Sequence, residues 1–523
     1  MRQGRSVTLW TTGTLPDAQD TQVLVLAGAP GRDDDDREGT VQVQEPSRLT
    51  GLMSPSSTPL DIPAMGSGGL TMYQFGAAML ATDVVDCVQR PGKTYYESCG
   101  QELIVGAPDR FIESTPGKAF LYVADPSTNT GYRWQSTIGT PSTMPLSNGD
   151  QFGASFAAPR SPRAVDMPWQ INPDPAPWVA IGAPGAQRVY VYYDLDHARK
   201  DPLTDAAGAI PPRVVELRAP VGNFGYELAA GDFDGDGIPD LAVGAPSSSV
   251  YDFTVNPSER GVIFMYWGTT DTSEPLYPFM DALTAPNPNT TQIDPMLLGS
   301  TNPNPWYDPV MRGSARACPT GAASPLRCAN GGGSTLAAGR VRSDDDSRDY
   351  LLAGYPTWSR GEGYVCQFTF QKLPTGDRVP GPRTKCFPDL SNFSAAPNEF
   401  GFSVEWADLN PVDSFGSKQS VESRYLEAAI SSPAAVGPAG SAPAAAGRVD
   451  LFPSDSEGIN PTVAFTADVR DNEGAVVNGR FGAYISAGYV HESPFEDLWI
   501  GSPRRNTGAG TATLTLADNP AQC

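Results

Sequence analysis

Short apolar runs separated by turn residues recur along the whole chain. Residues 103–105 and 241–243 are continuous apolar runs, a pattern typical of strands buried on both faces. Residues 189–193 and 261–267 are rich in β-branched and aromatic side chains, which favour strands. No stretch keeps the 3.6-residue hydrophobic period of an amphipathic helix over several turns. The pattern therefore predicts an all-β chain.

These runs belong to a repeat in which Phe-Gly precedes one apolar run and a Gly-Ala-Pro triplet ends the next. Glycine lets the chain leave the strand tightly, and proline removes an N–H where pairing stops. The Phe-Gly copies lie at Phe75-Gly76, Phe152-Gly153, Phe224-Gly225, Phe400-Gly401 and Phe481-Gly482. The triplets, some of them altered, begin at residues 28, 106, 182, 244, 354, 431 and 501. The first triplet has no Phe-Gly before it, and the unit that contains residues 336–339 lacks the Phe.

Several short strands per unit, repeated around seven triplets, predict a radial all-β propeller. A solenoid of such long units would need capping repeats, and none is visible. We expect a single propeller domain over residues 1–523, with residues 6–12 as the first inner strand. The expected blades are 6–60, 71–145, 150–215, 222–285, 331–395, 398–470 and 479–518, with a long insertion at 269–330.

The Phe-Gly and Gly-Ala-Pro repeat resembles the FG-GAP repeat of the integrin alpha-subunit head. The resemblance covers about residues 6–518, and it implies a seven-bladed β-propeller built from FG-GAP repeats. In integrins, one face of the propeller holds a partner subunit and a ligand. This chain shows neither leg domains nor an inserted metal-dependent adhesion domain, so the integrin partner is not carried over.

Residues 232–240 form the sharpest chemical motif of the sequence. Carboxylates occupy loop positions 1, 3, 5 and 9, and a main-chain carbonyl occupies position 7; the corresponding residues are Asp232, Asp234, Asp236, Asp240 and Ile238. Gly235 and Gly237 permit the sharp turns. Four acids this close repel one another unless a hard dication neutralises them, and a flexible loop of oxygen ligands suits Ca²⁺. The spacing also matches the calcium loop of FG-GAP blades, whereas the alternative is a solvated acidic turn. We expect a structural calcium ion that ties the inner strand to its neighbour.

The equivalent loops of other units depart from this pattern. Arg340 and Arg342 occupy the first two ligand places of the fifth unit, where a guanidinium could replace the cation by pairing with acids such as Asp349. The loop that starts at Asp408 continues with Asn410 and Asp413 before an insertion, which leaves a second calcium site open. The last unit keeps only Asp497 as a carboxylate, and the acidic run 33–36 is interpreted as a solvated turn.

Charge, hydrophobicity and missing motifs disfavour several classes of function. The formal net charge is −23, and an acidic surface disfavours binding to nucleic acid. No apolar run is long enough for a transmembrane helix. The chain has only two histidines and lacks the Gly-x-Ser-x-Gly, His-Glu-x-x-His and phosphate-loop motifs, so we expect a non-catalytic protein. A pair of acids for glycoside hydrolysis stays open, because acids are abundant.

Six of the seven cysteines form close pairs in the sequence: Cys87 and Cys99, Cys318 and Cys328, Cys366 and Cys386. This spacing predicts three local disulfides and an oxidising compartment, although buried reduced thiols are the alternative. Cys523 is left over. No apolar signal segment follows Met1, so an extracellular, cell-surface or periplasmic location requires a targeting segment outside this chain.

Tryptophans in predicted loops suggest a binding surface. Trp134, Trp169, Trp178, Trp306 and Trp358 lie outside the strands that we assigned from the triplets. Such aromatics either bind proteins and sugars or pack over blade edges. The favoured function is an extracellular adhesion or protein-interaction module that binds a protein ligand or a cell-surface or matrix component. The alternatives are a carbohydrate-binding, lectin-type propeller and a targeting domain of a larger secreted or surface protein.

Overall fold

The fold is taken from a computed structural model of the 523-residue chain. The structure describes residues 6–12, 22–29, 39–44, 58–60, 74–82, 84, 101–109, 115–124, 128, 130, 132–140, 144–159, 178–193, 195, 213–218, 223–246, 262–268, 290–293, 333–341, 348–356, 363–372, 378–381, 383–388, 398–409, 426–435, 447–455, 458–460, 465–468, 480–488, 496–502 and 511–515.

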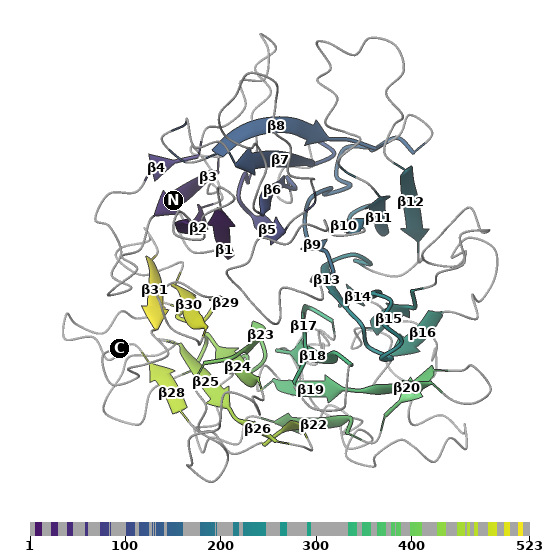
Figure 1. Cartoon of the computed structure of the whole chain (residues 1–523), viewed down its shortest axis with the longest axis vertical. Coiled ribbons are helices and arrows are strands. Elements are labelled where there is room, and N and C mark those ends of the chain that lie inside the picture. Colours follow the sequence, from purple (N-terminus) through teal and green to yellow (C-terminus); the bar gives the residue numbers. More distant parts are fainter. Residues whose placement is uncertain are drawn as a thin grey trace, which may run out of the picture.

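Seven antiparallel sheets of three or four strands make up the described part of the chain, as Figure 1 shows. The first three sheets contain β1 (Ser6–Thr12), β2 (Gln22–Ala29), β3 (Thr40–Gln44) and β4 (Thr58–Pro59); β5 (Ala78–Thr82), β6 (Glu102–Ala107), β7 (Lys118–Ala124) and β8 (Tyr132–Ile138); β9 (Phe156–Ala157), β10 (Trp178–Ala183), β11 (Arg188–Tyr193) and β12 (Arg213–Arg218). The fourth and fifth contain β13 (Glu227–Gly231), β14 (Asp240–Ala245), β15 (Val262–Tyr266) and β16 (Thr290–Ile293); β17 (Thr335–Gly339), β18 (Tyr350–Tyr355), β19 (Tyr364–Phe368) and β22 (Lys385–Pro388).

The sixth sheet contains β23 (Val404–Ala407), β24 (Glu427–Ser432), β25 (Arg448–Phe452) and β28 (Phe465–Asp468), and the seventh contains β29 (Tyr484–Gly488), β30 (Asp497–Ser502) and β31 (Thr511–Thr515). Two small hairpins add β20 (Phe370–Lys372) with β21 (Arg378–Pro380), and β26 (Ser454–Asp455) with β27 (Gly458–Ile459).

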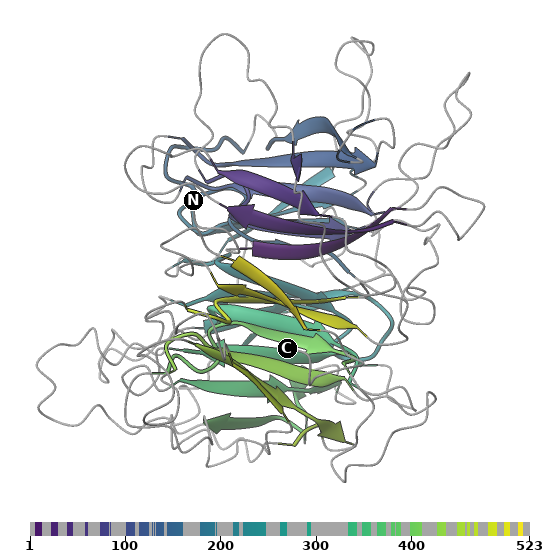
Figure 2. The same cartoon turned by 90° about the vertical axis from the view of Figure 1, so that its left-hand side faces the viewer.

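The first strand of each sheet lies near the centre of a closed ring (Figure 1). Each of these strands contacts the first strands of the two neighbouring sheets, and β29 contacts β1 to close the circle. Figure 2 shows the same sheets from the side of the ring. The predicted all-β propeller is confirmed, and the described residues contain no helix that is long and apolar enough to cross a bilayer.

Two predicted boundaries can be compared directly with the strands. The first inner strand is β1, which spans the predicted residues 6–12. The fourth sheet, in contrast, extends past the predicted end at residue 285. Its outer strand β16 pairs with β15 and lies inside the segment 269–330 that we expected to be an insertion. The polar composition of β16 hid it from a search for apolar runs.

In five of the seven units, the Phe-Gly pair makes a turn that starts the inner strand. The residue before Phe has a left-handed backbone in Gln74, Gln151, Asn223, Glu399 and Arg480, with φ between 55° and 63°. The Gly of the motif is also left-handed, and its N–H donates to the carbonyl at the first triplet position of the same sheet, as in Gly225 to Gly244 at 3.1 Å. In the fifth unit Gly333, with φ of 74°, occupies this glycine position although the Phe is absent.

The glycine that begins four of the triplets, at residues 106, 182, 244 and 354, lets the neighbouring sheet approach. A Cβ built on Gly106 would lie 2.0 Å from the carbonyl oxygen of Gly153, and a Cβ on Gly244 would lie 2.0 Å from that of Gly333. Successive sheets therefore interlock through backbone contacts that a side chain would block. This explains why the Phe-Gly and Gly-Ala-Pro motifs occur together.

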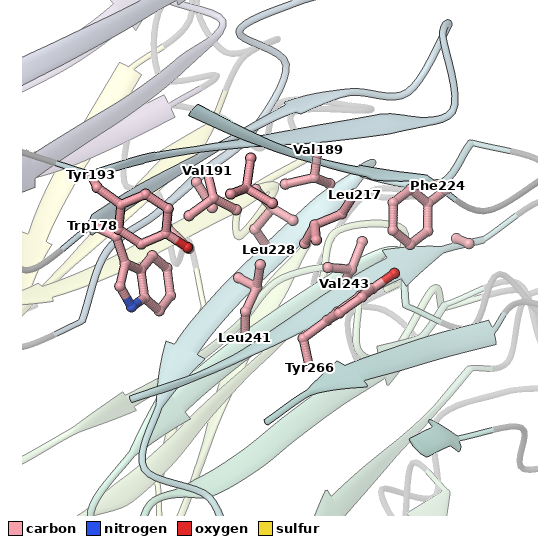
Figure 3. Packing of buried hydrophobic residues seen from close by; sticks show 14 residues of the cluster. Trp178, Val189, Val191, Tyr193, Leu217, Phe224, Leu228, Leu241, Val243 and Tyr266 are labelled. Atoms are coloured by element: carbon pink, nitrogen blue, oxygen red, sulfur yellow. The ribbon is translucent and has the colours of Figure 1, made fainter. Parts of the chain in front are cut away.

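The hydrophobic core lies between neighbouring sheets. Figure 3 shows Val189 and Leu217 of the third sheet facing Val243 and Tyr266 of the fourth. Phe224 is fully buried in this cluster and makes edge-to-face contacts with Phe264 and Tyr266, with centroid distances of 5.3 Å and 6.3 Å. These two ring contacts lie within the fourth sheet, and Phe224 belongs to the core cluster that the fourth sheet shares with the third.

Trp178 corrects one expectation from the sequence. It is the first residue of β10, the strand that ends in the third triplet, and only 2% of it is exposed. It belongs to the core between the third and fourth sheets (Figure 3). Trp134, in contrast, is 40% exposed on the outer strand β8. Trp169, Trp306 and Trp358 lie outside the described residues.

Cys366 is disulfide-bonded and lies on β19, where the strand register places it opposite Cys386 on β22. This is one of the three predicted pairs. The other five cysteines, Cys87, Cys99, Cys318, Cys328 and Cys523, lie outside the described residues.

Candidate metal centre

The Asp-rich loop connects the inner strand β13 to β14. Gly235 and Gly237 adopt left-handed backbone conformations with φ of 77° and 81°. Both glycines donate N–H groups to the carboxylate of Asp232, Gly235 to Oδ1 at 2.9 Å and Gly237 to Oδ2 at 3.0 Å. The loop therefore wraps around its first residue.

Three of the four predicted carboxylates converge in this loop. Asp232, Asp234 and Asp240 each contribute an oxygen atom, and these atoms lie within 4.8 Å of one another. Asp234 and Asp240 are buried, and Asp232 is half-buried. Asp236 is exposed and lies outside this group; its Oδ1 accepts the N–H of Ile238 at 3.0 Å. No other such group of three ligating side chains occurs in the described parts of the chain.

Asp240 also holds the ends of the loop together. It is the first residue of β14 and is only 1% exposed. Its Oδ2 accepts the N–H of Phe233 at 2.9 Å, and its Oδ1 accepts the N–H of Gly268 at 2.8 Å. The carboxylate thus ties the start of the loop and the main chain just after β15 (Val262–Tyr266) to the start of β14, and one of its oxygens lies within 4.8 Å of oxygens of Asp232 and Asp234.

Burial and mutual repulsion penalise the charged forms of these acids. Desolvation, followed by the nearby charges of Asp349, Asp236 and Asp234, raises the pKa of Asp232 to about 6, although the Gly237 N–H opposes the shift. Desolvation also raises the pKa of Asp240 well above its ordinary value. A hard dication would relieve this penalty, and converging carboxylate oxygens are the donor set that Ca²⁺ prefers. The residues present therefore fit a calcium ion.

The loop is also attached to the fifth sheet. Asp349, which directly precedes β18, accepts the N–H of Asp232 with Oδ2 at 2.8 Å and donates its own N–H to the Asp232 carbonyl at 2.7 Å. Phe233 is fully buried and contacts Phe370 of β20, with a centroid distance of 6.3 Å; Trp267 packs on the same ring at 5.2 Å. The candidate metal centre therefore lies at the junction between two sheets.

The other predicted loops are described only in part. Arg340 lies close to Asp349, with Nε 3.7 Å from Oδ1, which agrees with the predicted pairing of a guanidinium with these acids. At the sixth sheet, Asp408 exchanges two hydrogen bonds with Glu496, one through the Glu496 carboxylate at 2.9 Å and one from its N–H at 2.6 Å. Ligand positions that lie outside the described residues are Asp33–Asp36, Arg342, Asn410, Asp413 and the last loop before Asp497.

An acid at the start of the second strand is a recurring feature that our sequence search missed. Glu102 accepts the N–H of Val84 at 3.0 Å, and Glu427 accepts that of Leu409 at 2.9 Å, as Asp240 does for Phe233. The signal was an acidic residue directly before an apolar run that ends in a triplet. Asp349 also directly precedes an apolar run that ends in a triplet, but its contact with Asp232 had no sequence signal, because the two residues are 117 positions apart.

Comparison with known protein families finds a match that includes the candidate metal centre. The model of the FG-GAP repeat family matches residues 224–261, which include the Phe-Gly turn and the Asp-rich loop. Phosphatidylinositol-glycan-specific phospholipase D of Homo sapiens is 35% identical over 107 residues, 19% of this chain and 12% of that protein. Integrin alpha-6 of Gallus gallus is 30% identical over 163 residues, 30% of this chain and 13% of that protein.

The aligned segments thus span only about an eighth of these relatives' own length. The solved structure of Sqt1 from Chaetomium thermophilum covers 85% of this chain and 84% of its own, with 12% identity and a TM-score of 0.37, a likeness too weak to bear on function. The repeat match and the integrin similarity agree with the motifs and the fold. The chain is an FG-GAP repeat protein that resembles integrin alpha subunits over part of its length.

Proposed function

We propose that this chain is an extracellular, non-catalytic FG-GAP propeller that binds calcium and acts as an adhesion or protein-interaction module. The observation that carries the calcium assignment is the convergence of Asp232, Asp234 and Asp240 within 4.8 Å. Asp236 and the carbonyl of Ile238 are proposed to complete the ligand set. The bound ion would supply the positive charge that these buried acids lack.

The role of the ion in this proposal is structural. Asp240 joins the loop to β14 and to Gly268, and Phe233 packs on the fifth sheet. Fixing the carboxylates would therefore fix the junction between the fourth and fifth sheets. A rigid junction presents its surface loops in one arrangement, which lowers the entropy lost when a partner binds.

The proposed partner is a protein ligand or a cell-surface or matrix component. The partial similarity to integrin alpha subunits and the FG-GAP repeat at residues 224–261 both support this proposal. An extracellular, cell-surface or periplasmic location would suit the disulfide of Cys366. The net charge of −23 disfavours nucleic acid as a partner.

A non-catalytic role is supported by the lack of recognised hydrolase motifs in the sequence. The similarity to the phospholipase D covers 12% of that enzyme, so its activity is not carried over to this chain. A targeting domain of a larger secreted or surface protein would use the same binding surface. The lectin alternative loses one of its aromatic candidates, because Trp178 is buried.

The test of the interaction role is binding of the purified chain to an array of extracellular protein domains and, in parallel, to a glycan array, each in calcium and in chelator. We expect saturable binding to a protein that is weakened in chelator and by the Asp234→Ala substitution. Gly139→Ala, which adds a methyl group that meets no atom within 4 Å and lies outside the Asp-rich loop, serves as the control. Saturable binding to glycans alone would replace the proposal with the lectin function, and no saturable binding on either array would contradict both.

A further inference from the structure

Asp349 links two sheets through a single residue of the candidate metal centre. Its carboxylate accepts the Asp232 N–H at 2.8 Å, and its own N–H donates to the Asp232 carbonyl at 2.7 Å. The main chain of the first candidate ligand is therefore held on both sides by the neighbouring sheet. Since Asp349 directly precedes β18, a regular strand of the fifth sheet fixes its position.

Arg340 in turn lies beside Asp349. Its Nε is 3.7 Å from the Asp349 Oδ1, whereas the Asp349 Oδ2 is the atom that accepts the Asp232 N–H. The guanidinium therefore faces one oxygen of the carboxylate and the metal loop faces the other. A positive charge here offsets the repulsion between Asp349 and the acids of the loop, so the carboxylate can stay close to Asp232.

We propose that Asp349 is a positioning residue for the calcium site, held in place by Arg340, and that calcium binding is thereby coupled to the junction of the fourth and fifth sheets. This inference rests on the proposed calcium binding. Partners that orient metal ligands change metal affinity by about 10–100-fold when they are removed. Asp349 would act in this way, through the main chain of Asp232 rather than as a ligand.

The test is calorimetric calcium titration of the full chain and of its Asp349→Ala and Asp349→Asn variants. We expect Asp349→Ala to weaken calcium binding by about tenfold or more. Asp349→Asn should weaken it less, because an amide oxygen can still accept the Asp232 N–H. Arg340→Gln should also weaken binding, because the carboxylate loses its counter-charge. Unchanged affinity in Asp349→Ala would overturn the inference.

Glu399→Ala provides the matched control. Glu399 also joins two neighbouring sheets, through a salt bridge to Arg480, but it is not part of an Asp-rich loop. This variant should keep the calcium affinity of the unmodified chain; an equal loss in both variants would mean general destabilisation and would overturn the inference. If the unmodified chain binds no calcium, the proposed calcium binding fails as well. Normal binding with an unaffected Asp349→Ala contradicts the positioning role alone.

Discussion

Asp234 and Asp240 differ in what they do within one loop. Asp240 accepts two main-chain N–H groups, and acids at the same strand position make the equivalent bond in the second and sixth sheets. An acid at this position is therefore a repeated device that closes the loop. At the position of Asp234 the sequence has Val85 in the second unit and Asn410 in the sixth, so the carboxylate of Asp234 distinguishes the candidate metal loop from those two loops.

The raised pKa of Asp232 predicts that the stabilisation of the chain by calcium depends on pH. The pKa of Asp232 is raised to about 6 from 3.8, so the folded chain without metal binds a proton more readily than the unfolded chain does. Its contribution to stability is present below about pH 4 and is lost as the pH rises through 6. Calcium needs the deprotonated carboxylate. We therefore expect the increase in melting temperature caused by calcium to shrink as the pH falls from about 7.5 to about 5.

The measurement is a pair of melting curves, in calcium and in chelator, at each pH. Comparing the two curves cancels the titration of acids that do not contact the ion. Asp232→Asn is the control: its amide does not titrate, so its calcium effect should depend on pH only through the remaining ligand carboxylates, such as Asp240. An effect of calcium that is equal at pH 7.5 and pH 5 in the unmodified chain would contradict the assignment.

The interlock between sheets makes a prediction about one glycine. A Cβ on Gly106 would lie 2.0 Å from the carbonyl oxygen of Gly153, so Gly106→Ala forces the second and third sheets apart. We expect a loss of about 3 kcal/mol in the free energy of unfolding, at the upper end for overpacked sites. Urea unfolding measures this loss. Gly139→Ala, which meets no atom within 4 Å, should change stability by less than about 0.5 kcal/mol.

The turn phenylalanines predict a second effect on stability. Phe224 is fully buried against Phe264 and Tyr266 between the third and fourth sheets. We expect Phe224→Ala to lower the free energy of unfolding by about 3–5 kcal/mol, because it leaves a cavity in that core. Trp134→Ala removes a larger but exposed side chain and should have little effect on urea unfolding. If Phe224→Ala and Trp134→Ala both lower the free energy of unfolding only slightly, the phenylalanine of the Phe-Gly motif is not the core residue that we infer.

The sequence predicted the strands correctly where a short motif determines the local backbone. The Phe-Gly turns and triplets located the inner strands, including residues 6–12, where no Phe-Gly pair precedes the triplet. The prediction was wrong for Trp178, which we placed outside the triplet strands although it begins β10, and it missed β16, in which three of the four residues are polar. In the fifth unit, the turn glycine Gly333 was hidden once its Phe was lost.

At the scale of the whole molecule, each core cluster is shared by two neighbouring sheets, and β29 contacts β1 to close the ring. No sheet therefore buries its apolar faces alone. The sequence predicted this architecture and the three converging aspartates from local spacing. It did not predict Asp349 at the metal loop, because a contact between residues 117 positions apart depends on how successive sheets pack.

The most direct test of this account is calorimetric melting of the full chain in calcium and in chelator, together with Asp234→Ala. A ligand at a hundred times its Kd stabilises the folded state by about 2.7 kcal/mol, so calcium should raise the melting temperature of the unmodified chain. Asp234→Ala should melt alike in both solutions, and close to the unmodified chain in chelator. Identical melting of the unmodified chain with and without calcium would contradict the claim that this loop binds calcium and stabilises the ring.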